Sequence, residues 1–165
     1  MLIGVVSDTH NNYPAVSKAL ALLTERGVSQ ILHCGDIEDK ETVALFAGFD
    51  THFVFGNCDS DRSSLRRAMT KTGATLHEHF GSLELSGVKI AWLHGDNSRM
   101  RRDLEASGHY DFLFYGHTHH HEAHQAGSTW IINPGALYRA KPKTFLVLDL
   151  ERKQWESVEI DGESP

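Results

Sequence analysis

Short apolar runs alternate with amphipathic stretches through the first half of the chain. Each run is short enough for a buried strand, and apolar positions between the runs repeat at helical spacing. Pro14 and Gly27 supply start and stop signals for the first helix. The predicted strands are residues 2–7, 30–33 and 51–55, and the predicted helices are residues 14–26, 41–49 and 62–72. Strands that alternate with helices predict a parallel sheet built from βαβ units.

The second half of the chain is richer in strands. Residues 82–85 and 88–94 flank a Ser86-Gly87 turn and predict a hairpin. The other predicted elements are a helix at 100–107 and strands at 111–115, 122–125, 129–132, 144–150 and 155–160. We expect this half to be largely antiparallel. Because no linker or repeat separates the halves, the pattern predicts one domain over residues 1–165, of the α/β class, with two packed mixed sheets and outer helices.

Five polar motifs share one kind of position, because each lies in the loop that leaves an apolar strand. They are Asp8-Thr9-His10, Gly35-Asp36, Gly56-Asn57-Cys58-Asp59, His94-Gly95-Asp96 and Gly116-His117-Thr118-His119. In such sheets, ligands bind in the crevice beyond the carboxyl ends of the strands. Each motif alone is an ordinary polar turn. All five together, each after a strand, predict a single shared site.

The side chains of these motifs form a mixed nitrogen and oxygen ligand group. They are Asp8, His10, Asp36, Asn57, His94, His117 and His119. Such a set suits Mn, Fe, Zn, Co or Ni better than Mg or Ca, which prefer oxygen alone. Seven ligands exceed the needs of one catalytic ion but suit two ions with open positions. On an extended backbone, alternate residues of Asp-X-His and His-X-His lie on one side and reach one cluster. The glycines of the motifs allow close approach of a ligand to the backbone.

With these residues, the sequence resembles the calcineurin-like metallophosphoesterase superfamily, whose signature is D-x-H, G-D, G-N-H-D/E, a lone His and G-H-x-H. It is most similar to small YfcE-like phosphodiesterases and to the related retromer scaffold subunit, from Ile3 to at least Gly135. The resemblance implies a four-layer αββα sandwich with two metals at the sheet edge. It implies that one ion is held by Asp8, His10 and His119, the other by Asn57, His94 and His117, with Asp36 bridging them. A hydroxide held between the ions would then attack the phosphorus.

The sequence departs from the signature at Cys58, where many members have a histidine that assists the leaving group. We expect a preference for good leaving groups, or another acid such as His120 or His121, and the alternative for Cys58 is a small buried residue. Aspartates beside the motifs either orient imidazoles or cap loops; they are Asp39, Asp59 and Asp96. The expected catalytic residues are Asp36, Asn57, Cys58, Asp59 and His94. Histidines outside the motifs are expected at the surface; they are His52, His77, His79, His109 and His124.

Composition narrows the possible functions. The 165 residues carry 16 Lys and Arg against 22 Asp and Glu, for a formal net charge of −6. The densest basic cluster is confined to residues 99–102, so we expect no stable nucleic-acid binding, and a nuclease is disfavoured. Two cysteines, with no signal-like or membrane-spanning stretch, predict a cytoplasmic enzyme without a membrane partner.

Two functions from different classes follow from these observations. The first is a two-metal phosphoesterase acting on small-molecule phosphate esters, phosphodiesters before phosphomonoesters. Mn²⁺ is the expected ion, with Ni²⁺, Co²⁺, Fe²⁺ and Zn²⁺ as alternatives. The second is a protein-binding scaffold of the same fold without turnover, as in the retromer subunit. The complete ligand group favours the enzyme. The substrate and the oligomeric state stay open, a homo-oligomer included.

Overall fold

A computed structural model describes residues 1–161 as two β-sheets and four helices. The first sheet has the order β11-β10-β1-β2-β3-β4, formed by Gln154–Glu159, Thr144–Asp149, Leu2–Val6, Gln30–His33, Asp50–Phe53 and Thr75–Leu76. The second has the order β5-β6-β7-β9-β8, formed by Phe80–Leu85, Val88–Leu93, Phe112–Tyr115, Thr129–Asn133 and Glu122–Ala126. The helices are α1 (Tyr13–Glu25), α2 (Lys40–Leu45), α3 (Arg62–Thr72) and α4 (Ser98–Ser107).

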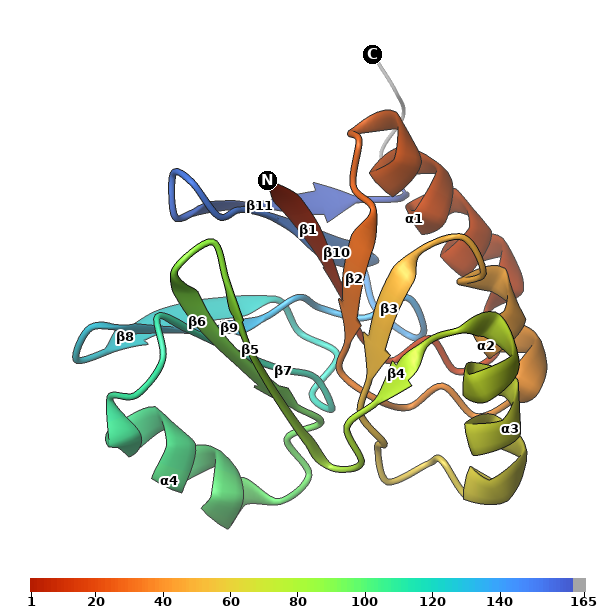
Figure 1. Ribbon diagram of the computed structural model, residues 1–165, viewed down its shortest axis with the longest axis horizontal. Helices are drawn as coiled ribbons and strands as arrows, with labels where there is room; N and C mark the ends of the chain where they lie inside the picture. The colour runs from red at the N-terminus through yellow and green to blue at the C-terminus, as the bar shows by residue number, and fades with distance from the viewer. Residues whose placement is uncertain (162–165) are drawn as a thin grey trace.

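The elements stack in four layers, which confirms the predicted αββα sandwich. Helices α1, α2 and α3 lie beside the first sheet, and α4 lies beside the second (Figure 1). Three apolar clusters fill the spaces: one under α1 to α3, one between the sheets around Trp92, and a smaller one under α4. Helix α4 has no fully buried residue, and only Met100 and Leu104 pack against that third cluster. Helix α4 is therefore the least buried of the four helices.

The predicted antiparallel character of the second half is confirmed for most of its strand pairs but not for the centre of the second sheet. Within that sheet, strands β6, β7 and β9 pair in parallel, and the outer pairs β5–β6 and β8–β9 are antiparallel. Strands β10 and β11 join the first sheet instead, where β10 pairs antiparallel with β1. The apolar residues of β10 are buried on both of its faces, so it needs a central position between helices and the second sheet. Turn signals specify neighbouring hairpins and carry no information on such distant pairing.

One predicted boundary also changes, and one strand was not predicted. Helix α2 ends at Leu45 rather than at residue 49, because the N–H groups of Phe46 and Ala47 bond three residues back in a tighter turn before Gly48 at φ 101°. The two-residue strand β4 is too short and too exposed to leave a pattern in the sequence. Within residues 1–161, no helix is long and apolar enough to cross a membrane.

The topology brings the polar motifs together. Strands β1, β2 and β3 run parallel in the first sheet, and β6 and β7 run parallel in the second. The motif loops follow these five strands directly, so each sheet delivers its motifs to one edge. Backbone hydrogen bonds tie neighbouring loops, as in Asp8 N–H to Gly35 O and Gly116 N–H to His94 O.

Candidate metal centre

Three predicted ligands meet around one carboxylate, that of Asp8. Its Oδ1 lies 3.8 Å from His10 Nε2 and 3.3 Å from His119 Nε2. These three residues offer donor atoms that all lie within 4.8 Å of one another, close enough to hold one ion. They come from the loops after β1 and β7, about 110 residues apart in the chain.

A second group forms around Asp36. Its Oδ2 lies 3.4 Å from His10 Nε2 and 3.3 Å from His94 Nε2, so this one oxygen faces both halves of the ligand group. Asn57 Oδ1 lies 3.0 Å from the same nitrogen of His94. The rings of His94 and His117 have their centroids 5.1 Å apart. All seven predicted ligands thus gather at one place.

Each of the two carboxylates has one oxygen bonded to protein and one free of it. Asp8 Oδ2 accepts from the Ser7 hydroxyl and from the His117 N–H, and Asp36 Oδ1 accepts from the Cys58 N–H. Asp8 Oδ1 and His10 Nε2 are buried and have no hydrogen-bond partner within residues 1–161. Buried polar atoms without a partner are costly. Their positions, facing other lone pairs, fit a divalent cation that would satisfy them together.

The ring nitrogens that face away from this group are fixed by hydrogen bonds. His94 Nδ1–H donates to the carbonyl oxygen of Cys34 at 2.8 Å, which leaves Nε2 for the centre. His10 Nδ1 lies 2.6 Å from Glu38 Oε1, and Glu38 also accepts from the amide of Asn11. Such partners orient imidazoles that bind metals. Glu38 was missed in the sequence because a glutamate two residues beyond a motif has no distinguishing signal.

The electrostatics of the group show a surplus of negative charge. Burial alone would lower the pKa of His10, but the neighbouring carboxylates of Asp8 and Glu38 outweigh burial and raise that pKa to about 9. Burial opposes ionisation of Asp8 as well, yet the neighbouring imidazoles of His10 and His119 hold its pKa well below the usual range. The carboxylates therefore recruit protons onto the neighbouring rings. A bound cation would supply the same compensation.

The backbone of the ligand loops differs from the extended form expected for Asp-X-His and His-X-His. Five ligands have positive φ; they are Asp8 (51°), His10 (40°), Asp36 (58°), His117 (70°) and His119 (60°). Asp and His are among the few residues that adopt this left-handed region with some frequency. Successive turns of the chain, not the alternation of a strand, bring the paired side chains to one cluster.

Asp59 braces the loops rather than orienting an imidazole. The residue is 2% exposed, and its carboxylate accepts hydrogen bonds from four backbone N–H groups. These donors are Asp36, Ile37, Glu38 and Gly56, at 2.7–3.0 Å. The loop after β2 is thereby fastened to the loop after β3. Asp39 likewise caps α2 by accepting from the Thr42 N–H. For these two aspartates, the loop-cap alternative is the one observed.

The motif glycines allow close approach of neighbouring loops. A Cβ on Gly56 would overlap the carboxylate of Asp36, and a Cβ on Gly116 would overlap the hydroxyl of Ser7 and approach Asp8. The space that a side chain would need at these glycines is filled by Asp36, Ser7 and Asp8. Packing of these loops against each other is what sets the ligand positions.

Several residues outside the ligand group also differ from expectation. Cys58 is exposed, so the alternative of a small buried residue is wrong. His52 is buried rather than at the surface, where its Nδ1 lies 2.9 Å from His77 Nε2. Tyr138, which the motifs did not indicate, has its ring centroid 5.0 Å from that of His10.

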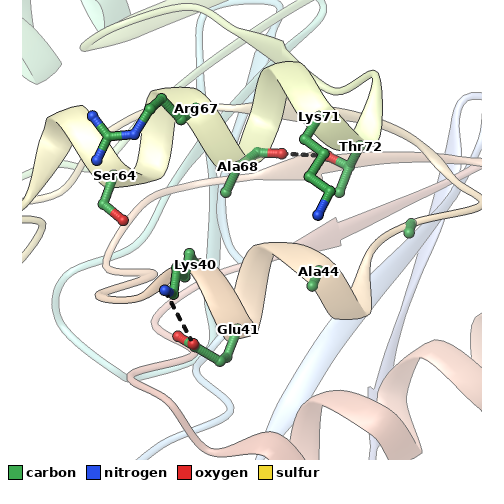
Figure 2. A pocket seen from close by; sticks show the side chains of 9 residues that line it. Lys40, Glu41, Ala44, Ser64, Arg67, Ala68, Lys71 and Thr72 are labelled. Atoms are coloured by element: carbon green, nitrogen blue, oxygen red, sulfur yellow. Dashed lines mark hydrogen bonds and ion pairs between the residues drawn. The ribbon is translucent and has the colours of Figure 1, made fainter.

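A hollow of about 750 Å³ lies between α2 and α3, away from the ligand group. Figure 2 shows the side chains around it, with Lys40 directed toward Glu41, its ion-pair partner at 3.8 Å. None of the predicted site residues lines it. A smaller hollow, of about 260 Å³, adjoins the ligand group and is lined by His79, His94, Asp96 and Met100 among others.

Residues 1–153 match the family model of the calcineurin-like phosphoesterase superfamily domain. The chain belongs to this superfamily. A curated member, Phosphodiesterase MJ0936 of Methanocaldococcus jannaschii, is 28% identical over 98% of this chain and 100% of its own length. The resemblance predicted from the motifs is therefore confirmed.

Solved structures similar to this chain have the same fold. An archaeal phosphodiesterase has a TM-score of 0.89 at 28% identity, covering 96% of this chain and 99% of its own. The phosphoesterase YfcE of E. coli has a TM-score of 0.70 at 21% identity, covering 97% and 100%. Vps29 of Chaetomium thermophilum has a TM-score of 0.69 at 16% identity, covering 95% and 94%. The last two show the fold alone.

Proposed function

We propose that the protein is a metal-dependent phosphodiesterase that uses two divalent ions. Asp8, His10 and His119 would hold one ion, and Asn57, His94 and His117 the other. Asp36 would contact both, since its Oδ2 lies near His10 Nε2 and His94 Nε2. The observation that carries the proposal is the pair of buried atoms without partners, Asp8 Oδ1 and His10 Nε2, within this ligand group. The superfamily membership and the phosphodiesterase relative point the same way.

When bound, such ions lower the pKa of coordinated water and neutralise charge on a phosphoryl oxygen. The residues of the chain prepare the centre for this chemistry. Glu38 and the Cys34 carbonyl hold the His10 and His94 rings with one nitrogen directed inward. Asp59 fixes the Asp36 loop through backbone N–H groups. Asn57 and His117 are exposed, which leaves the centre accessible to substrate on their side.

Two histidines, His120 and His121, are the candidates for the acid that protonates the leaving oxygen. His121 donates to the Asn133 carbonyl oxygen at 2.9 Å and packs against Trp155, so it is engaged outside the ligand group. His120 is exposed and has no such contact within residues 1–161. Of these two, His120 is the one without such an engagement within residues 1–161, and a preference for good leaving groups needs no acid at all.

The proposed substrates are small-molecule phosphodiesters. The hollow beside His94 is small, and the formal net charge of −6 disfavours extended nucleic acids.

We further propose Mn²⁺ as the native ion, with Ni²⁺, Co²⁺, Fe²⁺ and Zn²⁺ as alternatives, a cytoplasmic location, and a single metallophosphoesterase domain over residues 1–165. A non-catalytic scaffold is the weaker alternative, because it would leave the buried, unpartnered ligand atoms without a purpose.

The test is hydrolysis of bis-p-nitrophenyl phosphate by metal-stripped protein resupplied with Mn²⁺. We expect release of nitrophenol that depends on the ion and that is lost in His117→Ala. His109→Ala is the matched control, since His109 is exposed and lies outside the ligand group. Equal turnover by the two variants would contradict the assigned ligands. Absence of turnover with Mn²⁺, Ni²⁺, Co²⁺, Fe²⁺ and Zn²⁺ would refute the enzyme and favour the scaffold.

A further inference from the structure

Cys58 stands where it can reach the metal centre. Its Sγ, one ring nitrogen of His10 and one carboxylate oxygen of Asp36 all lie within 4.8 Å of one another. These two neighbours are proposed metal ligands, and His10 Nε2 belongs to a side chain that is 9% exposed and has no hydrogen-bond partner within residues 1–161. A third donor atom therefore lies beside two residues that the proposed function assigns to a metal ion.

The position of the thiol is set by the protein backbone. The Cys58 N–H donates to Asp36 Oδ1 at 2.8 Å, and Asp59, the next residue, is fastened by four backbone N–H groups. The contact to the sulfur is an N–H of the Asn57 side chain at 3.4 Å, a weak hydrogen bond that uses only acceptor capacity. The sulfur itself lies within 4.8 Å of donor atoms of His10 and Asp36.

We propose that Cys58 is a conditional ligand, which binds through sulfur when a thiophilic ion such as Zn²⁺ or Cd²⁺ occupies the site between His10 and Asp36. This inference rests on the proposed function and deepens it, because it sets which ions the centre prefers. Soft thiolate ligands select Zn²⁺ and related ions, whereas Mn²⁺ prefers oxygen and gains little from sulfur. As the sulfur–metal bond forms, the S–H bond breaks and its proton passes to the buffer.

The consequence is a preference for thiophilic ions that is larger than the one the other seven ligands produce. With a sulfur ligand, the centre binds Zn²⁺ and Cd²⁺ more tightly than its nitrogen and oxygen donors alone allow. A cysteine engaged in this way is also unavailable as a proton donor to a leaving group. The ion in the site would thus decide whether residue 58 acts as a ligand or as a free thiol.

The experiment is a Cd²⁺ titration of metal-stripped protein, followed by the sulfur-to-cadmium charge-transfer absorption in the ultraviolet. We expect the band in the wild type and in Cys34→Ala, whose thiol is fully buried between the sheets, and no band in Cys58→Ser. Calorimetry should show that Cys58→Ser weakens Zn²⁺ binding about tenfold or more while Mn²⁺ binding changes little. Cys58→His, which replaces sulfur by an imidazole, should retain Zn²⁺ binding but lose the band, and it guards against misfolding of the serine variant.

The outcomes separate this inference from the proposed function. Mn²⁺ uptake and turnover without a cadmium–sulfur band would overturn the role of Cys58 and leave the phosphodiesterase intact. A band that persists in Cys58→Ser, or an equal loss of Zn²⁺ and Mn²⁺ binding in that variant, would also overturn it. Uptake of no ion at all by the wild type would refute both proposals.

Discussion

Replacing Asp59 by Asn tests whether one buried carboxylate holds the metal-centre loops. The substitution keeps the size of the side chain but exchanges one acceptor oxygen for an NH₂ group, which can only donate. In the protein, each Asp59 oxygen accepts two backbone N–H groups: Oδ1 from Ile37 and Glu38, and Oδ2 from Asp36 and Gly56. Whichever oxygen is replaced, two buried N–H groups lose their acceptor and face another donor.

The magnitude follows from those two lost hydrogen bonds. A buried donor left without a partner costs about 1–3 kcal/mol, so two cost about 2–6 kcal/mol. In a domain of this size, 1 kcal/mol lowers Tm by roughly 2–4 °C. We therefore expect Asp59→Asn to lower Tm by about 10 °C, and by no less than about 4 °C. Because the Asp36 backbone N–H is among the four donors, binding of Mn²⁺ should weaken as well.

The assay is thermal unfolding of metal-stripped protein by circular dichroism, followed by calorimetric titration with Mn²⁺. Asp61→Asn is the matched control in the same loop. Asp61 is exposed and caps α3 by accepting from the Ser64 N–H, a role that Asn fills equally well, so its Tm should stay within about 2 °C of the wild type. If Asp59→Asn matched this control in both Tm and Mn²⁺ affinity, the brace assigned to Asp59 would be refuted.

Three further predictions follow from single contacts. Glu38→Gln should reduce Mn²⁺ affinity about tenfold in calorimetry, because the His10 ring loses the carboxylate that orients it. Gly56→Ala should lower the free energy of unfolding by about 1–3 kcal/mol in a denaturant titration, because the new methyl group overlaps the Asp36 carboxylate. Burial and a neighbouring imidazole lower the pKa of His77, so the unfolded chain binds a proton that the folded protein does not. Stability from this residue is therefore present above about pH 6.5 and declines as the pH falls below it, and His77→Gln should make Tm less sensitive to acid.

Matched controls keep these effects specific. Glu41→Gln changes an exposed glutamate of α2 and should leave Mn²⁺ affinity unchanged. Gly127→Ala adds a methyl group that meets nothing within 4 Å, so only its positive φ of 61° adds a cost. His109→Gln alters an exposed histidine and should retain the acid sensitivity of the wild type. Each prediction is contradicted where the variant and its control behave alike.

The sequence was sufficient for those features that depend on local patterns. Apolar runs located the longer strands, and the polar residue after each run located the loops that carry the ligands. The reason is that parallel strands end at one edge, so a residue placed after a strand is also placed in space. The gathering of Asp8 and Asp36 follows from that rule alone, whereas His94 follows a strand of the second sheet and meets them because the two sheets pack together. Their roles as ligands stay predictions until an ion is measured.

The features that could not be predicted depend on partners far apart in the chain. Strand β10 pairs with β1, an arrangement that no turn signal encodes. Asp59 meets the backbone of residues 36–38, and backbone N–H groups leave no trace in a sequence. His52 looked like an isolated surface histidine because its contacts, Gln30 and His77, lie on other segments. In each case, side-chain type was known and the partner was not.

The left-handed backbone of the ligand loops explains why so many buried hydrogen bonds surround the centre. Residues held at unfavourable φ and ψ cost about 1–3 kcal/mol each and persist only where the surroundings fix them. His33 is an example of a residue whose hydrogen bonds fix the backbone of the first two motifs. The Gly35 N–H donates to His33 Nδ1, so Nε2–H donates to the Thr9 hydroxyl, which in turn donates to the Asp36 carbonyl oxygen. Burial lowers the pKa of His33 to about 3, so this chain stays neutral and intact at physiological pH. The backbone strain at the ligands is thus offset by hydrogen bonds of neighbouring buried residues. These hydrogen bonds, more than the ligand side chains themselves, determine the positions of the donor atoms.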